Sequence, residues 1–161
     1  MHDAWDGSIG GVYRQENNMH AMRKLNVAVL LWAFATGAAL AETAHLTANL
    51  QPSSEVPPTT SHGQGMVQAD YDTSTKALRW TITYEGLTGP ATAAHFHGPA
   101  GVGVNAPPVI PIPKESLASP IKGEQTLTEA QQSDLMSGKW YFNIHTKEHP
   151  GGEIRGQVVP K

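Results

Sequence analysis

The histidines are the side chains of this sequence with the clearest capacity for chemistry. Residues 42–161 hold six of them: His45, His62, His95, His97, His145 and His149. Imidazole nitrogen is a ligand for Cu(II), Zn(II) and Ni(II), and the intrinsic affinity order among these ions favours copper. The chain has no cysteine, which excludes disulfides, thiolate metal ligands and a cysteine nucleophile. These residue types therefore indicate metal binding by imidazole alone.

The closest pair of histidines, His95 and His97, flanks Phe96 in an H-x-H pattern. If residues 93–97 form a strand, both rings leave the same face, about 7 Å apart. Two rings so placed can converge on one ion with bonds of about 2 Å. Phe96 would then point into the core and anchor the strand.

A second pair, His145 and His149, is spaced four residues apart. Residues 140–145 alternate in the strand manner, which places His145 on the polar, solvated face, while His149 lies in the turn that follows. We expect His95, His97 and His145 to be metal ligands, with His149 as a candidate fourth. The alternatives are a hydrogen-bonding role or plain polar surface. Periodicity does not supply the strand adjacency that the site requires.

Three further side chains are candidates to orient these ligands. Asn143 shares a strand face with His145, so we expect it to hold a ligand by a hydrogen bond. Glu153 and Arg155 lie on one face of the strand expected next, where they have the same candidate role. The alternative for this pair is an ion pair on the protein surface.

The elements that must position these residues are mostly short strands. The patterns predict strands over 45–50, 66–71, 77–84, 93–97, 140–145 and 153–159. We expect 66–71 to pair with 77–84, and 140–145 with 153–159, as hairpins. Thr128 and Gln131 form a capping-box pattern ahead of one short helix that ends at Gly138, and residues 98–113 are expected to be a long loop.

Composition narrows the classes of protein and of partner. The chain has 161 residues, a net charge of −3 and 16 glycines, so we expect many turns and one all-β domain over residues 42–161. Basic residues are not concentrated enough to follow a phosphate backbone, so nucleic acid is not an expected partner. Residues 22–41 read as a secretory signal peptide cleaved after Ala41. We expect residues 1–21 to be a non-native extension or to precede the true start, at Met19 or Met22.

Four motifs of this chain, in this order, resemble the CHRD domain, first named in chordin. They are EVPP at 55–58, AHFHGPA at 94–100, YFNIHT at 141–146 and PGGEIRGQ at 150–157. The resemblance implies an antiparallel, Greek-key-like sandwich or barrel, similar to superoxide dismutases or immunoglobulin domains. It also implies counterparts of His95, His97 and His145 in the family, whereas His149 is peculiar to this chain. In chordin the domains accompany growth-factor-binding modules, which implies a binding scaffold.

The leading hypothesis is a periplasmic or secreted protein that binds copper, with zinc as the alternative ion, for sequestration, delivery or tolerance. We expect binding to weaken below about pH 6, where imidazoles protonate. One alternative is a metal-free module that binds another exported protein through the loop at 98–113. The other is a copper redox enzyme, although the chain lacks the cysteine pair and the zinc half-site of superoxide dismutases, and no nucleophile motif indicates catalysis. No later apolar run is long enough to span a membrane. The sequence leaves the oligomeric state open.

Overall fold

The computed structural model describes residues 42–161, so the extension and signal peptide predicted at 1–21 and 22–41 lie outside the described residues. The fold is all-β with one short helix, as predicted. The strands are β1 (Thr43–Leu50), β2 (Gln64–Asp72), β3 (Ala77–Glu85), β4 (Ala93–His97), β5 (Pro108–Pro111), β6 (Ile121–Thr126), β7 (Trp140–His145) and β8 (Ile154–Pro160). The helices are α1 (Glu129–Met136) and the two 3₁₀ turns η1 (Pro52–Ser54) and η2 (Lys114–Ser116).

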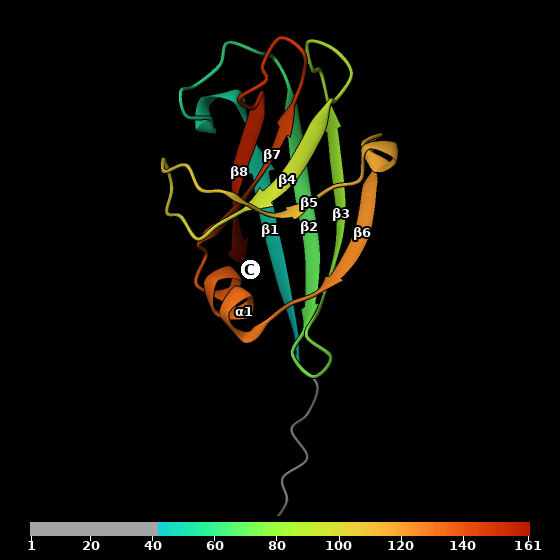
Figure 1. The fold of residues 1–161 in the computed structure, drawn as a ribbon, viewed down its shortest axis with the longest axis vertical. Helices are drawn as coiled ribbons and strands as arrows, with labels where there is room; N and C mark the ends of the chain where they lie inside the picture. The colour runs from blue at the N-terminus through green and yellow to red at the C-terminus, as the bar shows by residue number, and fades with distance from the viewer. Residues whose placement is uncertain (1–41) are drawn as a thin grey trace, which may run out of the picture. The chain divides into compact units, whose positions relative to one another are not determined.

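All eight strands belong to one antiparallel sheet, in the order β5-β4-β7-β8-β1-β2-β3-β6 (Figure 1). The sheet curls so that its two halves face each other. The rings of Trp80 on β3 and Phe96 on β4 pack with centroids 5.2 Å apart, although four strands separate β3 from β4 in the sheet. The concave side encloses the core, in a sandwich- or barrel-like arrangement.

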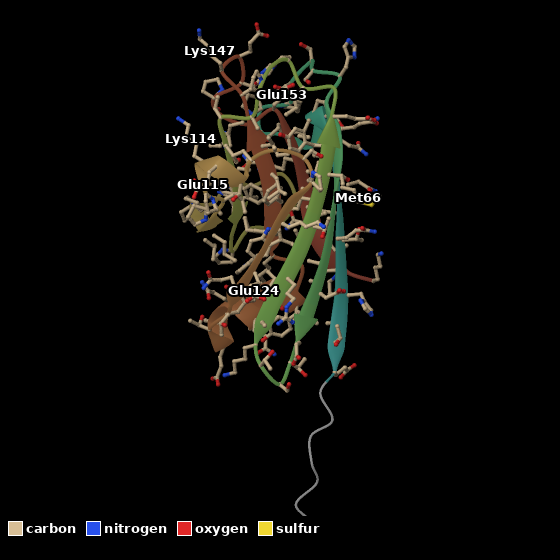
Figure 2. The ribbon with its side chains drawn as sticks, turned by 90° about the vertical axis from the view of Figure 1, so that its right-hand side faces the viewer. Met66, Lys114, Glu115, Glu124, Lys147 and Glu153 are labelled. Atoms are coloured by element: carbon tan, nitrogen blue, oxygen red, sulfur yellow. The ribbon has the colours of Figure 1, made fainter. Side chains whose placement is uncertain are left out.

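The alternation of apolar and polar residues along each strand determined which side chains enter this core. Leu78, Trp80 and Ile82 of β3 are all buried, and so is Phe96, as the H-x-H pattern predicted. The opposite side of the same half of the sheet faces solvent: Figure 2 shows Met66 of β2 pointing outward, and its exposed fraction is 41%.

Both predicted hairpins form. β2 pairs with β3 across the turn after Asp72, whose carboxylate accepts hydrogen bonds from the backbone N–H groups of Ser74 and Thr75. β7 pairs with β8. Helix α1 begins with the predicted capping box, in which the Thr128 hydroxyl and the Gln131 side chain each accept from the other's backbone N–H. These local signals were sufficient because each depends on neighbouring residues only.

Two parts of the sheet differ from the sequence prediction. Part of the expected loop at 98–113 is strand β5, which pairs with β4. β5 begins and ends in proline, a residue that sequence reasoning takes as a strand breaker but that an edge strand tolerates. Strand β6, at the opposite edge of the sheet, was not predicted. Ile121 is its only buried residue, so β6 has no apolar alternation to detect.

Candidate metal centre

Strands β4 and β7 are immediate neighbours, which supplies the adjacency that the sequence could not. In their antiparallel register, Ala93 lies opposite His145, His95 opposite Asn143, and His97 opposite Tyr141. Phe96, between the two histidines of β4, anchors the strand against the rings of Phe142 and Trp140 in the core. The side chains of His95, Asn143, His97 and His145 consequently leave the same face of the sheet, opposite the core.

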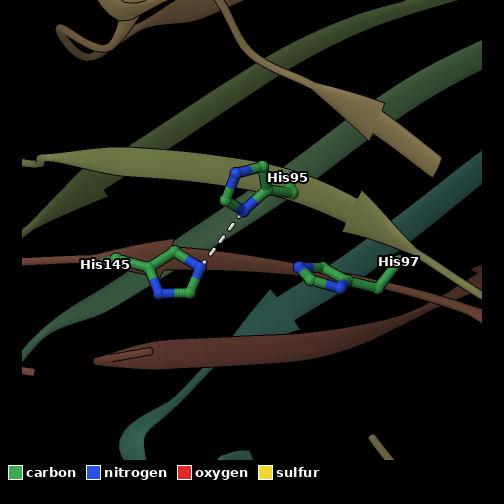
Figure 3. A group of neighbouring side chains, drawn as sticks. All are labelled: His95, His97 and His145. Carbon is green, nitrogen blue, oxygen red and sulfur yellow. Dashed lines mark hydrogen bonds between the residues drawn. The ribbon is translucent and has the colours of Figure 1, made fainter. Parts of the chain in front are cut away.

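The three rings gather at one point of this face (Figure 3). Each of His95, His97 and His145 offers a nitrogen, and these three nitrogens all lie within 4.8 Å of one another. The His95 ring centroid lies 5.3 Å from that of His97 and 5.0 Å from that of His145. Metal–imidazole bonds are about 2.0–2.1 Å long, so nitrogens that share one ion lie within about 4.2 Å of one another, slightly closer than the spread in this group.

Backbone carbonyls fix the orientation of two of the rings. The Nδ1 atom of His97 lies 2.8 Å from the carbonyl oxygen of Ala106, and Nδ1 of His145 lies 2.9 Å from that of Pro150. A carbonyl oxygen only accepts, so each Nδ1 carries the proton and donates it. In the neutral rings the Nε2 atoms are left with lone pairs, the tautomer that a metal ligand needs.

The site is drier than the sequence suggested. The face carrying His145 was expected to be solvated, yet Tyr141 and Asn143 on that face are 3% exposed and His97 is 8% exposed. The loop between β4 and β5, residues 98–107, covers the part of this face that carries His97 and Tyr141, where Ala106 hydrogen-bonds to both side chains. Sequence periodicity could not predict this burial. It indicates which side of a strand is polar, but not whether a loop from elsewhere in the chain lies over that side.

Burial keeps the three imidazoles neutral. Desolvation lowers the pKa of His95 from its ordinary value of 6.5 to about 4, and the neighbouring His145 and His97 lower it further. Desolvation also lowers the pKa of His97 and of His145. The rings therefore hold their lone pairs at more acidic pH than ordinary histidines do.

Arg155, predicted to orient a ligand or to pair with Glu153, acts on the covering loop. Its guanidinium donates to Oδ1 of Asn105 at 2.9 Å and to the carbonyl oxygen of Val104, and it stacks on the ring of Tyr141, 3.4 Å from the centroid. The ring of His97 also stacks on Tyr141, with centroids 4.7 Å apart and planes 2° from parallel. Arg155 thus holds the loop segment whose Ala106 carbonyl orients His97.

Glu153 is fully buried and has partners of its own, so the expected surface ion pair with Arg155 does not describe it. Its carboxylate accepts hydrogen bonds from Ser61 Oγ at 2.6 Å, from Thr88 N at 2.8 Å and from the hydroxyls of Thr88 and Thr146. Burial raises the pKa of Glu153, but these donors outweigh that effect and leave it below its usual value. Glu153 fixes Thr146, and through it the end of β7 that carries His145.

His149 lies outside the group of three. Its backbone closes the turn after β7, where its carbonyl oxygen accepts from the N–H groups of Thr146 and Gly152. The residue lines a separate pocket with Glu148 and Glu55. His45 lies elsewhere, on the outer face of β1, where its Nδ1 is 2.6 Å from Asp70 Oδ1.

Sequence reasoning assigned Glu55 no role of its own. Glu55 is 4% exposed, and its Oε1 atom has no hydrogen-bond partner within the described residues. Burial raises the pKa of Glu55 to about 7, against the lowering effects of the Arg155 charge, the Val56 N–H and the Asn143 amide. Its presence in the EVPP motif was the one signal in the sequence that pointed to it.

Comparison with known proteins agrees with the motifs. The CHRD domain model matches residues 46–158, which is more than half of the chain. No curated protein and no solved structure matches the chain. Among the described residues, no helix is long and apolar enough to cross a membrane. The matched range contains the histidine group and all eight strands, except for the first residues of β1 and the last residues of β8. The chain belongs to the CHRD domain family.

Proposed function

We propose that this protein is an exported metal-binding protein whose ion is copper, held by His95, His97 and His145. The observation that carries the proposal is the convergence of three imidazole nitrogens, all within 4.8 Å of one another, from two adjacent strands. Burying imidazole nitrogens without a partner is unfavourable, and these three histidines lie partly or fully out of solvent with their nitrogens directed at one another. A metal ion would satisfy all three lone pairs at once.

The ligand chemistry supports copper as the ion. Imidazole ligands suit copper, zinc and nickel, and the intrinsic affinity order places Cu(II) above the other two. Desolvation keeps the rings neutral, and neutral imidazole is the form that binds a metal. Zinc is the alternative ion, because it accepts the same nitrogens in a tetrahedral arrangement.

The role follows from the character of the site. The predicted signal peptide at 22–41 directs the protein out of the cytoplasm. Outside the cytoplasm this chain offers copper no thiolate ligand, because it has no cysteine. One histidine of the group is buried and two are partly exposed. This arrangement suits a protein that binds an ion and then transfers it. We therefore assign the protein to copper sequestration, delivery or tolerance.

Calorimetric titration of the purified protein with Cu(II) and with Zn(II) tests this function. We expect one ion per chain, and we expect the His95→Ala/His97→Ala double variant to lose that binding. His149→Ala is the matched control, because it removes an imidazole from the next turn without touching the group of three. Binding by the double variant as tight as that of the parent would contradict the proposed site.

A metal-free interaction module is the second candidate, and one observation favours it. Val102 and Val104 project from the covering loop with exposed fractions of 82% and 55%. Apolar side chains at a loop tip are the kind that a protein partner buries. Under this function the histidines would only hold the loop, and neither ion would bind in the titration described above.

A further inference from the structure

Asn143 lies inside the histidine group. Its Oδ1 atom is 3.0 Å from Nε2 of His97 and 3.0 Å from Nε2 of His145. Nε2 of His145 lies in turn 3.2 Å from Nδ1 of His95. Four electronegative atoms, one from each of these side chains, thus lie at successive separations of 3.0 to 3.2 Å.

The protons available do not account for the contacts of Oδ1 as hydrogen bonds. A neutral imidazole has one N–H. His97 and His145 donate theirs from Nδ1 to the carbonyl oxygens of Ala106 and Pro150. Each Nε2 therefore presents a lone pair to Oδ1, which is itself only an acceptor. Lone pairs that face one another repel unless a cation lies between them.

The orientation of the Asn143 amide is set from its other side. On that side the amide nitrogen Nδ2 faces the buried Glu55 carboxyl, whose Oε1 has no hydrogen-bond partner among the described residues and which accepts an N–H when ionised. Gly152 permits this packing: a Cβ at that position would lie 2.3 Å from Glu55 Oε1 and 2.8 Å from Asn143 Nδ2. With Nδ2 turned to Glu55, Oδ1 points at the histidines.

The separations match those between neighbouring ligands on one ion. Bonds of about 2.0–2.2 Å at angles of about 90–109° place adjacent ligand atoms about 2.8–3.6 Å apart. The three contacts of 3.0, 3.0 and 3.2 Å fall in this range. Hydrogen bonding and metal coordination both produce such distances, and for the two contacts of Oδ1 the count of protons favours coordination.

We propose that Oδ1 of Asn143 is the fourth ligand of the metal, and that Glu55 is the positioning residue that turns this oxygen toward it. The proposal deepens the copper function and depends on it. An amide oxygen is a harder donor than imidazole, so it favours divalent Cu(II) and Zn(II) over Cu(I). The amide oxygen thus strengthens the binding of the divalent ions, and the three imidazoles alone serve Cu(I).

Substitution of Asn143 separates the two oxidation states. Asn143→Leu keeps the branching and the number of heavy atoms and removes the oxygen, so we expect Cu(II) and Zn(II) affinities to fall by about tenfold or more. Cu(I) affinity, measured by competition with a chromophoric chelator, should stay within about threefold, since Cu(I) is satisfied by three nitrogens. Asn49→Leu, at an exposed asparagine on β1, is the matched control and should change none of these affinities.

Substitution of Glu55 tests the positioning role. Glu55→Gln retains an oxygen that accepts from the Asn143 amide, so we expect Cu(II) affinity within about threefold of the parent. Glu55→Met is apolar and of similar length, and it should lower Cu(II) affinity by about tenfold. Equal affinities of the two variants would overturn the role of Glu55.

An NMR measurement on the unsubstituted protein tests the same proposal and does not depend on whether a variant folds. Zn(II) is diamagnetic, and its coordination should shift the side-chain carbonyl carbon of Asn143, in step with the ring signals of His97 and His145. Ring signals that shift while this carbon does not would overturn the ligand role of Asn143 and leave the copper function intact. A protein that binds neither Cu(II) nor Zn(II) would overturn both.

Discussion

The Nδ1 atom of His95 lies 3.2 Å from Nε2 of His145, although 50 residues separate the two in the chain. The antiparallel pairing of β4 with β7 brings them together, because it sets His95 opposite Asn143, two residues before His145. The contact is diagonal across the two strands, a separation that long side chains bridge.

His145→Ala should abolish tight copper binding, and His149→Ala should not. His145 contributes one of the three converging nitrogens, while His149 belongs to the turn that follows. We expect Cu(II) affinity to fall by at least about 100-fold in the first variant, more than the 10- to 100-fold typical of groups that only support a ligand. Calorimetric titration of both variants measures this, and equal affinities would place the ion elsewhere.

Phe96→Ala should destabilise the protein by about 3–5 kcal/mol, the usual cost of truncating a buried aromatic ring. The Phe96 ring is fully buried and packs on Phe142 at 4.7 Å and on Trp80 at 5.2 Å, which joins the two halves of the sheet. Val102→Ala, at a residue 82% exposed, is the control and should change the free energy of unfolding by less than about 0.5 kcal/mol. Urea unfolding monitored by tryptophan fluorescence compares them.

Arg155→Lys should loosen the loop over the site although it keeps the charge. Lysine has no planar fork, so it cannot reproduce both the contacts to Asn105 and Val104 and the stacking on Tyr141. We expect a loss of about 2 kcal/mol and faster hydrogen exchange of amides in residues 101–106.

The matched control for this change is Arg79→Lys. Arg79 pairs with Glu124 on the exposed face of the sheet at 3.0 Å, so its replacement should cost no more than about 0.5 kcal/mol. Unchanged exchange of the loop amides in Arg155→Lys would show that the loop holds its place without the guanidinium.

Gly152→Ala should be far more damaging than Gly151→Ala. Gly152 has a φ of +128°, and a Cβ there would lie 2.3 Å from Glu55 Oε1, whereas a Cβ on Gly151 meets nothing within 4 Å. Strain and steric conflict together should cost about 2 kcal/mol or more at position 152. Thermal unfolding measures the difference, and similar midpoints for the two variants would contradict the packing of Glu55 against Gly152.

The metal-free protein should lose stability in acid, partly through His95. The pKa of His95 is about 4 when folded and 6.5 ordinarily, so the unfolded chain takes up this proton first. The stability linked to His95 is therefore complete above about pH 6.5 and is lost as pH falls toward about pH 4. His95→Gln cannot titrate at this position. The free energy of unfolding of the parent, relative to this variant, should decrease between about pH 7 and about pH 4.5 in urea titrations. A constant difference over this range would mean that the pKa of His95 is not lowered by folding.

The sequence by itself determined the elements that depend on near neighbours. Alternation placed Phe96 in the core and His95 and His97 together on the opposite face, because side chains along a strand project to alternate sides. The Thr128–Gln131 capping box set the start of α1, since both of its hydrogen bonds lie within one turn. The four motifs identified the family, which the domain match confirmed.

Only the tertiary structure decided what is close to what across the chain. Adjacency of β4 and β7 brought His145 to His95, and the loop over this face removed the water that the polar pattern implied. Glu55 and Asn143 meet because the segment after β1 packs against the turn before β8, where Gly152 leaves room. The order of the strands and the position of the loop result from packing between segments tens of residues apart in the chain. The periodicity of a short segment carries no information about that packing.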